Sequence, residues 1–300
     1  MSRQIAFVTY QKHPEITQDD ALAVNALGKL DITVAGIPWN KSGIDWRSFD
    51  AVVLRSCWDY YHHHEQFLAW INLLEENGVT VLNEPSVIRW NAEKTYLRDL
   101  SRVGVNVVPT VYALNNSSLS IADVLTQQAW DRAVVKPTVS GTSLHTWLTP
   151  PVAGGAALDA ALNSDQHKLG ILLAERNMML QEYLPEIESA GELSLIYFDN
   201  EYSHAIRKVP RAGDFRVQDD FGGTSTAVSP DAAIKRQADE ILVASNRSSV
   251  YARVDGVIRD GIFLLMELEL NEPHLFLGHD PNAATRFAHA IAQRIRDRAA

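Results

Sequence analysis

The sequence has little cysteine and comparatively few basic residues. Its 300 residues include one cysteine, Cys57, which excludes an intrachain disulfide and a cysteine-rich zinc site. Aspartate and glutamate number 37 against 27 lysines and arginines, so the formal net charge at pH 7 is −10. Because proteins that bind a phosphate backbone are usually basic, this balance argues against nucleic acid as a partner.

Long hydrophobic runs are also lacking. No stretch of about 18 consecutive apolar residues occurs, so neither a transmembrane helix nor a membrane partner is expected. The segment Met1–Gln4, which precedes the apolar run 5–10, is too short and too polar for a signal peptide. We therefore expect a cytoplasmic protein. The apolar share of 46% and the charged share of 21% are typical of a globular chain, and the length predicts about two domains.

The first third of the chain alternates strand and helix patterns. Short apolar runs predict strands, and helical periodicity predicts helices, at 5–10, 21–30, 32–37, 51–54, 65–76 and 79–82 in the order strand, helix, strand, strand, helix, strand. Phe67 and Trp70 lie on the apolar stripe of helix 65–76 and are expected in the core. This order predicts a small doubly wound parallel sheet.

The remaining two thirds mix strands and helices differently. The middle third predicts strands at 107–112, 133–136 and 179–183 and helices at 120–129 and 156–163. The last third predicts longer strands at 192–198, 201–207, 251–258 and 262–270, with helices at 232–245 and 281–298. The fold class is therefore α/β, with α+β organisation after the first sheet.

An acidic strand is the most informative segment. Side chains alternate along a strand, so Glu267, Glu269 and Asn271 share one face. Oxygen ligands in a row are costly to bury unless something binds them, and Mg²⁺ favours such hard ligands beside substrate phosphates. A solvent-exposed face of alternating charges is the alternative interpretation.

A second strand brings more polar residues to this face. Arg253 and Asp255 also alternate, and a hairpin turn at 259–261 would place Asp255 near Glu269. In this interpretation Asp255, Glu269 and Asn271 would hold two Mg²⁺ ions between phosphate oxygens.

Two lysines are candidates for phosphate contacts. Lys136 ends an apolar strand and precedes Ser140, Gly141 and Thr142, whose backbone N–H groups can cradle phosphate oxygens. This loop is not a Walker A motif. Lys94 begins an expected helix. Taken alone, each lysine is equally consistent with a solvated surface position.

The segment Gln181–Leu184 ends a strand and precedes a loop. Its backbone could edge an adenine, with Glu188 or Glu192 accepting from ribose hydroxyls. The alternative is an ordinary amphipathic edge strand.

Taken in order, these motifs resemble the ATP-grasp superfamily. The series runs from Lys94 through Lys136-Pro137, Gln181–Leu184 and Gly191-Glu192 to Arg253-x-Asp255 and Glu269-x-Asn271. The last two are similar to those of D-alanine–D-alanine ligases and bacterial glutathione synthetases. The resemblance implies an ATP-grasp fold with three parts, namely an N-terminal substrate-side domain at 1–92, a central lid subdomain at 93–186 and a C-terminal subdomain with the magnesium site at 187–300. The two α+β subdomains would clasp ATP.

The resemblance also implies roles for single residues. ATP and Mg²⁺ are the expected cofactors. Lys94 and Lys136 would hold the α and β phosphates, and the mobile loop with Ser140, Gly141 and Thr142 would close on ATP. The expected nucleotide contacts are Gln181, Glu182, Tyr183, Leu184, and Glu188 or Glu192. The expected metal ligands are Asp255, Glu269 and Asn271. Arg253 would face the transferring phosphoryl group, and the expected phosphate or carboxylate clamps are Arg207, Lys208 and Arg216.

A narrower resemblance concerns the group that closes O-ureidoserine to cycloserine. The segments Arg55–Tyr60 and Leu270–Leu277 are similar to that group, which implies substrate contacts from Arg55, Trp58, Asp59 and Glu272. Asp59 could instead cap the next helix. The stretch 191–194 departs from glutathione synthetases, which carry an aspartate and an arginine in this region.

The expected activity is therefore ADP-forming ligation of a small amino-acid-like carboxylate through an acyl phosphate, with intramolecular ring closure. A two-substrate, dipeptide-type ligase and a non-catalytic ATP-binding module are the alternatives. A homo-oligomer, dimer or tetramer, is implied by the superfamily.

Overall fold

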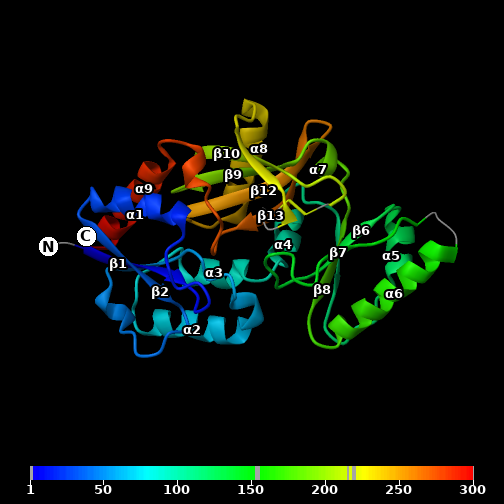
Figure 1. Ribbon diagram of the computed structural model, residues 1–300, viewed down its shortest axis with the longest axis horizontal. Coiled ribbons are helices and arrows are strands. Elements are labelled where there is room, and N and C mark those ends of the chain that lie inside the picture. The colour runs from blue at the N-terminus through cyan, green and yellow to red at the C-terminus, as the bar shows by residue number, and fades with distance from the viewer. Residues whose placement is uncertain (1–2, 153–155, 215, 218–220, 300) are drawn as a thin grey trace.

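Three sheets follow one another along the chain. The computed structural model describes residues 3–152, 156–214, 216–217 and 221–299. The strand orders are β2-β1-β3-β4, β5-β8-β6-β7 and β11-β10-β9-β12-β13. In Figure 1 the third sheet lies between the other two, with the first sheet on the left and the second on the right. This confirms the α/β class and the sequence of sheets that the patterns predict.

The first sheet is parallel throughout, as expected. Its elements are β1 (Arg3–Thr9), α1 (Gln18–Gly28), β2 (Ile32–Pro38), β3 (Ala51–Leu54), α2 (His64–Glu76) and β4 (Val81–Leu82), with short 3-10 turns at Trp46–Ser48 and Tyr60–His62. The strand expected from Val79 begins two residues later, because the Val79 N–H closes the end of α2 on Leu74 O at 2.9 Å.

Alternation along β1 divides the packing between two layers. Ile5 and Phe7 face α1 and the last helix, α9 (Ala283–Ala299), while Ala6 and Val8 face α2. Phe67 and Trp70 of α2 are buried there as predicted. The end of the chain therefore covers one face of the sheet with which the chain begins (Figure 1).

The second sheet is antiparallel. The elements of this part are α3 (Pro85–Asn91), α4 (Tyr96–Arg102), β5 (Thr110–Ala113), α5 (Ile121–Gln128), β6 (Ala133–Pro137), β7 (Trp147–Leu148), α6 (Ala156–Leu173), β8 (Met178–Glu182) and α7 (Glu186–Ser189). The expected end of α6 at Asn163 was wrong. The helix continues because Leu169, Leu172 and Leu173 pack into the core of this part.

The third sheet is also antiparallel. It contains β9 (Glu192–Phe198), β10 (Glu201–Val209), β11 (Thr224–Val228), β12 (Tyr251–Arg259) and β13 (Ile262–Glu269), with α8 (Ala232–Ser245) before β12 and a 3-10 turn at Leu277–His279. Asp260 and Gly261 have positive φ and form the predicted hairpin turn between β12 and β13.

The register of this hairpin differs from the expectation. Asp255 pairs with Glu267, whereas Arg253 pairs with Glu269. A bulge between Asp255 and Gly256 shifts the pairing, which alternation alone does not reveal. The acidic face nevertheless forms as predicted.

β13 is an edge strand, and side chains cover its free edge. Asn91 donates to Leu268 O and accepts from Leu270 N, each at 2.7 Å, and the Leu268 N–H reaches Tyr96 Oη at 3.1 Å. These bonds replace a neighbouring strand. They hold the acidic strand against the segment that joins the first and second sheets.

No helix within the described ranges is long and apolar enough to cross a membrane. The expected domain boundaries at 92 and 186 remain a prediction.

Candidate active site

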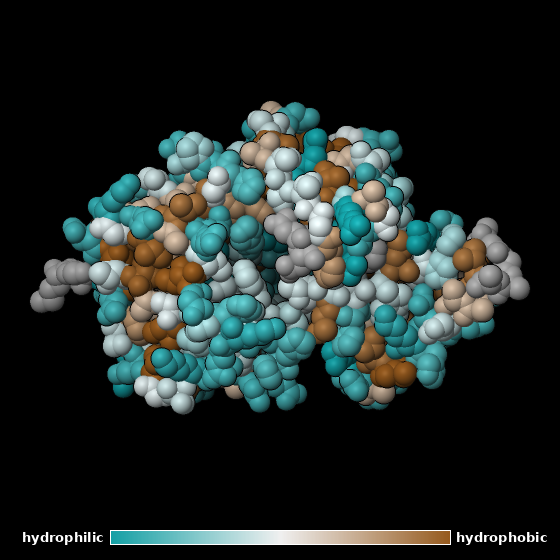
Figure 2. Space-filling model, viewed as in Figure 1, coloured by the Kyte–Doolittle hydropathy of each residue, from teal (hydrophilic) through white to brown (hydrophobic). Residues whose placement is uncertain are grey.

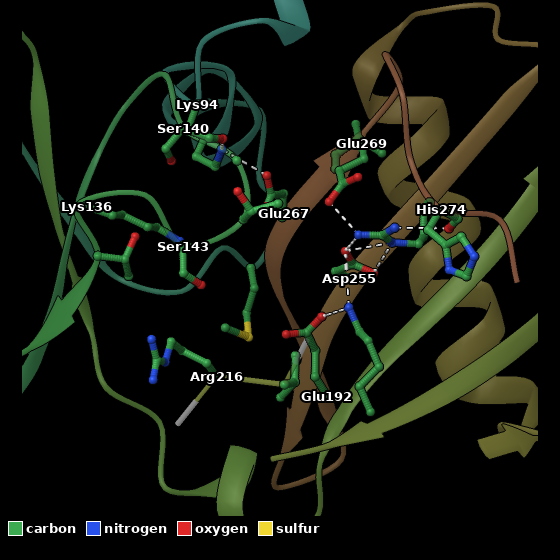
Figure 3. A pocket seen from close by; sticks show the side chains of 18 of the residues that line it. Lys94, Lys136, Ser140, Ser143, Glu192, Arg216, Asp255, Glu267, Glu269 and His274 are labelled. Atoms are coloured by element: carbon green, nitrogen blue, oxygen red, sulfur yellow. Dashed lines mark hydrogen bonds and ion pairs between the residues drawn. The ribbon is translucent and has the colours of Figure 1, made fainter. Parts of the chain in front are cut away.

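A cavity of about 450 Å³ opens where the three sheets meet. Figure 2 shows a hollow with polar walls near the middle of the visible face, and Figure 3 shows the side chains inside the cavity. The expected site residues that line it are Trp58, Lys94, Lys136, Ser140, Gly141, Thr142, Gln181, Glu182, Glu192, Lys208, Arg216, Arg253, Asp255, Glu269, Asn271 and Glu272. Segments far apart in sequence therefore form one site.

At one end of the cavity, hydrogen bonds and an ion pair hold the side chains of two lysines. Lys94 lies in the turn between α3 and α4, not in a helix as expected. Its Nζ donates to Ser140 O at 2.7 Å and pairs with Glu267 Oε1 at 3.0 Å. Lys136 Nζ donates to Gln181 Oε1 at 3.0 Å, and burial lowers its pKa. Two cations thus lie at one end, which is an arrangement that suits phosphate oxygens.

The loop between β6 and β7 reaches the N-terminal part of the chain. Thr142 Oγ1 lies 2.7 Å from Tyr61 Oη, and a Cβ on Gly141 would lie 2.5 Å from a carbon of the Tyr61 ring. Only glycine fits at that position without movement. Thr142, Ser143 and His145 all have positive φ, a region that β-branched residues such as threonine rarely adopt.

Arg253 is the centre of the opposite wall. Its guanidinium donates to both oxygens of Asp255 at 2.9–3.0 Å and to Glu269. Lys208 pairs with Glu192 and lies 3.7 Å from Asp255 Oδ2. Figure 3 shows Glu192, Asp255 and Glu269 on the same side of the cavity. The structure therefore brings the expected Arg-x-Asp and Glu-x-Asn motifs together.

The charges in this cluster perturb one another. Burial raises the pKa of Glu269 to about 7, and the neighbouring Glu267 and Asp255 add to this rise while Arg253 opposes it. Burial also acts to raise the pKa of Asp255, but Arg253 and Lys208 hold it below the usual value. Glu269 therefore lies close to other negative charges, and a bound cation would offset the repulsion between them.

The residues present fit a magnesium ion. Asn271 Oδ1 is buried and has no hydrogen-bond partner among the residues that the structure describes, and the amide is oriented because Asn271 Nδ2 donates to Ile88 O at 3.2 Å. An unsatisfied oxygen beside Glu269 is a suitable ligand for a hard cation. In the described part of the chain, no three acidic, histidine or cysteine side chains form a metal cluster by themselves, so oxygens from a substrate would have to complete the coordination.

The third wall comes from the N-terminal part and the segment after β13. Trp58 Nε1 donates to Glu272 O at 3.0 Å. Within the described ranges Glu272 Oε2 is buried without a hydrogen-bond partner, and the pKa of Glu272 is raised to about 8 by burial and by Glu269 and Glu267. His274 also lines the cavity and lies beyond Asp255 as seen from Lys94 and Lys136 (Figure 3).

Six expected site residues do not line the cavity. Arg55 is 2% exposed, and it donates to Asp20 at 2.9 Å and to Pro273 O at 3.0 Å. Asp59 accepts from Trp39 Nε1 at 2.7 Å and its side chain caps no helix, so the capping alternative was wrong. Arg55 and Asp59 therefore contact residues next to the cavity wall rather than the cavity itself.

Of the other four, Tyr183 and Leu184 follow β8, Glu188 lies in α7 and Arg207 lies on β10. Tyr183 Oη donates to Glu188, and Leu184 is buried in an apolar cluster. Along β10, Lys208 is buried toward the cavity and Arg207 is exposed on the opposite face, because side chains alternate. Glu192 is paired with Lys208. Neither glutamate proposed for the ribose is therefore without a partner.

Sequence reasoning missed several residues of the cavity. Glu267, Tyr61 and His274 line it but were not among the expected contacts. The alternation along β13 already placed Glu267 on the acidic face. The apolar lining from Ile187 and Met266 carried no signal in the sequence.

The chain is similar to known proteins over nearly its whole length. Residues 5–83 match the family model of the N-terminal domain of D-cycloserine synthetase DcsG. The cycloserine biosynthesis protein DcsG of Streptomyces lavendulae is 32% identical over 309 residues, covering 97% of this chain and 99% of that protein. A crystal structure of D-cycloserine synthetase DcsG matches with a TM-score of 0.86 at 30% identity, covering 97% and 99% of the two chains.

A more distant structure shares the fold. The D-alanine–D-alanine ligase of Bacillus anthracis, solved in complex with ATP, matches with a TM-score of 0.65 at 16% identity, covering 99% of this chain and 100% of that chain. The ordered motifs, the single cavity that collects them and the full-length similarity agree. The chain therefore belongs to the D-cycloserine synthetase family of ATP-grasp ligases.

Proposed function

We propose that the protein is an ADP-forming ligase that activates the carboxylate of a small amino-acid-like molecule and closes that molecule to a ring. The observation that carries this proposal is the layout of the cavity. Two lysines occupy one end, and Arg253 lies at the other between the carboxylates of Asp255 and Glu269. Charge neutralisation and positioning are the main requirements of phosphoryl transfer.

Lys94 and Lys136 are proposed to bind the α and β phosphates of ATP. Both are anchored through Nζ, to Glu267 with Ser140 O and to Gln181 respectively, so their ammonium groups are positioned before ATP arrives. Ser140, Gly141 and Thr142 line the same end and would close on the phosphates with their backbone N–H groups.

Asp255, Glu269 and Asn271 are proposed to hold Mg²⁺. When bound, the ion would supply positive charge to the phosphate oxygens. To coordinate it, Asp255 and Glu269 would turn from the Arg253 guanidinium. That movement would release Arg253 toward the transferring phosphoryl group.

The proposed reaction has two bond-forming steps. An oxygen of the substrate carboxylate attacks the γ-phosphorus, the bond to the departing ADP breaks, and an acyl phosphate forms. A nitrogen then attacks the acyl carbon, the carbon–oxygen bond to phosphate breaks, and phosphate leaves with the bonding electrons. A nitrogen of the same molecule gains from proximity, because effective molarities for intramolecular reactions reach ~10⁵ M or more.

Glu272 is proposed to bind a positively charged group of the substrate. Its Oε2 is buried without a partner beside Trp58, whose indole is fixed on Glu272 O. Since an unpaired buried carboxylate oxygen is costly, an ammonium group is a suitable partner.

The test is Mg²⁺-dependent release of ADP and phosphate across a panel of amino-acid carboxylates, with and without added amines. The panel includes O-ureido-D-serine and its L form. Release with one of these alone, together with a cyclic product, is the expected result. Turnover only with an added amine would instead establish a dipeptide-type ligase, and ATP binding without any turnover would establish a non-catalytic module. Light scattering would measure the expected dimer or tetramer.

A further inference from the structure

His274 lies at the substrate end of the cavity without a role in the proposal so far. His274 is among the residues that line the cavity, and its side chain is 38% exposed. Figure 3 places it beyond Asp255 as seen from Lys94 and Lys136. A group in this position is remote from the phosphate end and can meet the part of the substrate that carries the nucleophile.

The ring of His274 is held in place on two sides. Its Nε2 lies 3.5 Å from Asp19 Oδ2, and its edge packs against Phe276 with ring centroids 4.3 Å apart at 72°. Asp19 is itself fixed, because it accepts from Leu277 N and Gly278 N at 3.0 Å each. A carboxylate behind an imidazole orients the ring and stabilises its protonated form.

The backbone of His274 is tied to the reaction centre. Arg253 donates to His274 O at 3.0 Å, so the arginine fixes the segment that carries the imidazole. Among the described residues, Nδ1 of His274 has no hydrogen-bond partner, whereas Nε2 faces Asp19. One ring nitrogen therefore faces a carboxylate, and the other has no such partner within the described residues.

We propose that His274 accepts the proton of the nucleophilic nitrogen during ring closure, with Asp19 as the residue that positions its ring. This inference rests on the proposed function. As nitrogen attacks the acyl carbon, the new C–N bond forms, the C–O bond to phosphate breaks, and the N–H proton passes to the imidazole. Phosphate takes the bonding electrons, and the imidazolium later returns the proton to solvent.

The charge state at neutral pH agrees with this role. Burial lowers the pKa of His274 below its usual value, with Arg253 and Arg55 acting in the same direction and Asp19 and Asp20 opposing them. The imidazole is therefore neutral, and able to accept a proton, at pH 7.

The experiment separates the two chemical steps in the full-length protein. Hydroxylamine traps an acyl phosphate as a hydroxamate, which reports carboxylate activation, while the cyclic product reports ring closure. His274→Gln is compared with the wild type and with His289→Ala, which changes an exposed histidine on α9. We expect His274→Gln to form hydroxamate at close to the wild-type rate and to lose about 100-fold or more in cyclic product.

Two further measurements distinguish proton transfer from a structural role. The fall in ring closure at acidic pH is expected in the wild type and absent from the residual activity of His274→Gln. Added imidazole is expected to restore part of the ring closure to His274→Ala. Asp19→Asn is expected to lower ring closure less than His274→Gln.

Different failures have different meanings. Unchanged ring closure in His274→Gln, or an equal loss of hydroxamate and cyclic product, would overturn the role of His274 and leave the ligase function standing. Absence of hydroxamate from the wild type with every carboxylate of the panel would overturn the proposed function, and this inference with it.

Discussion

At the residue scale, the site depends on polar atoms that the protein leaves without partners. Asn271 Oδ1 and Glu272 Oε2 are both buried and unsatisfied, and they lie at neighbouring positions. The alternation of the acidic strand predicted that Asn271 faces the cavity, because only residue spacing is required. The sequence did not predict that Arg253 would occupy Asp255 and Glu269 together, because this depends on a bulge and on side-chain geometry.

Glu269→Gln tests the metal-binding role with little risk to folding. The pKa of Glu269 is already raised to about 7, so a neutral side chain of the same shape is tolerated there. We expect Mg²⁺-dependent ADP formation to fall about 100-fold or more, because a carboxylate ligand is lost. A thermal midpoint within a few degrees of the wild type is the control for folding. Near-normal ADP formation in this variant would contradict the role.

Glu272→Gln has an effect on stability that depends on pH. In the folded protein the pKa of Glu272 is raised to about 8 from its ordinary value of 4.5. The folded state therefore holds this proton more tightly than the unfolded state, and the contribution to stability is full below pH 4.5 and lost as pH rises through about 8. We expect Glu272→Gln to melt about 1–3 °C above the wild type at pH 8.5 and level with it at pH 4.5.

Differential scanning calorimetry at the two pH values measures this difference. Glu65→Gln is the matched control, because Glu65 is exposed on α2 and its replacement should shift neither midpoint. An equal shift at both pH values would show that the substitution acts through packing rather than through the proton.

At the element scale, β13 determines the site because it carries Glu267 and Glu269 and leads into Asn271. The strand, its partner β12 and the turn between them were all predicted from the sequence, since alternation and an Asp-Gly turn are local signals. The register was not, because one extra residue in a bulge changes every pairing beyond it. The cover of its free edge by Asn91 depends on contacts 177 and 179 residues apart, which no local pattern contains.

Asn91→Ala tests that cover. The substitution removes two hydrogen bonds and leaves Leu268 O and Leu270 N in a buried site without partners. We expect a loss of about 2–6 kcal/mol in the free energy of unfolding, from ~1–3 kcal/mol for each of the two unsatisfied groups. Urea denaturation measures it. Asn163→Ala, on the exposed side of α6, is the control and should change the free energy by less than ~0.5 kcal/mol.

At the scale of the whole molecule, the cavity exists only because three sheets meet. The ordered motifs predicted which segments contribute to it, and the family resemblance implied how they assemble. The contact of the β6–β7 loop with Tyr61 was not predicted. It joins the central part to the N-terminal part through Thr142 and Gly141, and residues 81 positions apart share no sequence pattern.

Gly141→Ala and Tyr61→Ala form a double-mutant cycle across that contact. The added methyl group of Gly141→Ala would lie 2.5 Å from the Tyr61 ring, so the loop or the ring must move. We expect about tenfold weaker ATP binding from Gly141→Ala, measured by titration calorimetry. In the double variant the collision is absent, so Gly141→Ala should weaken binding less when Tyr61 is already alanine. If Gly141→Ala weakened ATP binding equally with tyrosine or alanine at position 61, the two residues would not be energetically coupled.

The position of the last helix determines which apolar surface is exposed while the protein is being synthesised. Ile5 and Phe7 of the first strand pack in one apolar cluster with Phe287, Ile291 and Ile295 of α9. During synthesis the first sheet and α1 leave the ribosome long before these residues do, and the part of the face that α9 covers in the finished protein stays exposed meanwhile. Chaperones that bind exposed apolar surface would find it for most of translation, and a nascent chain stopped before Ala283 would keep that face open to aggregation.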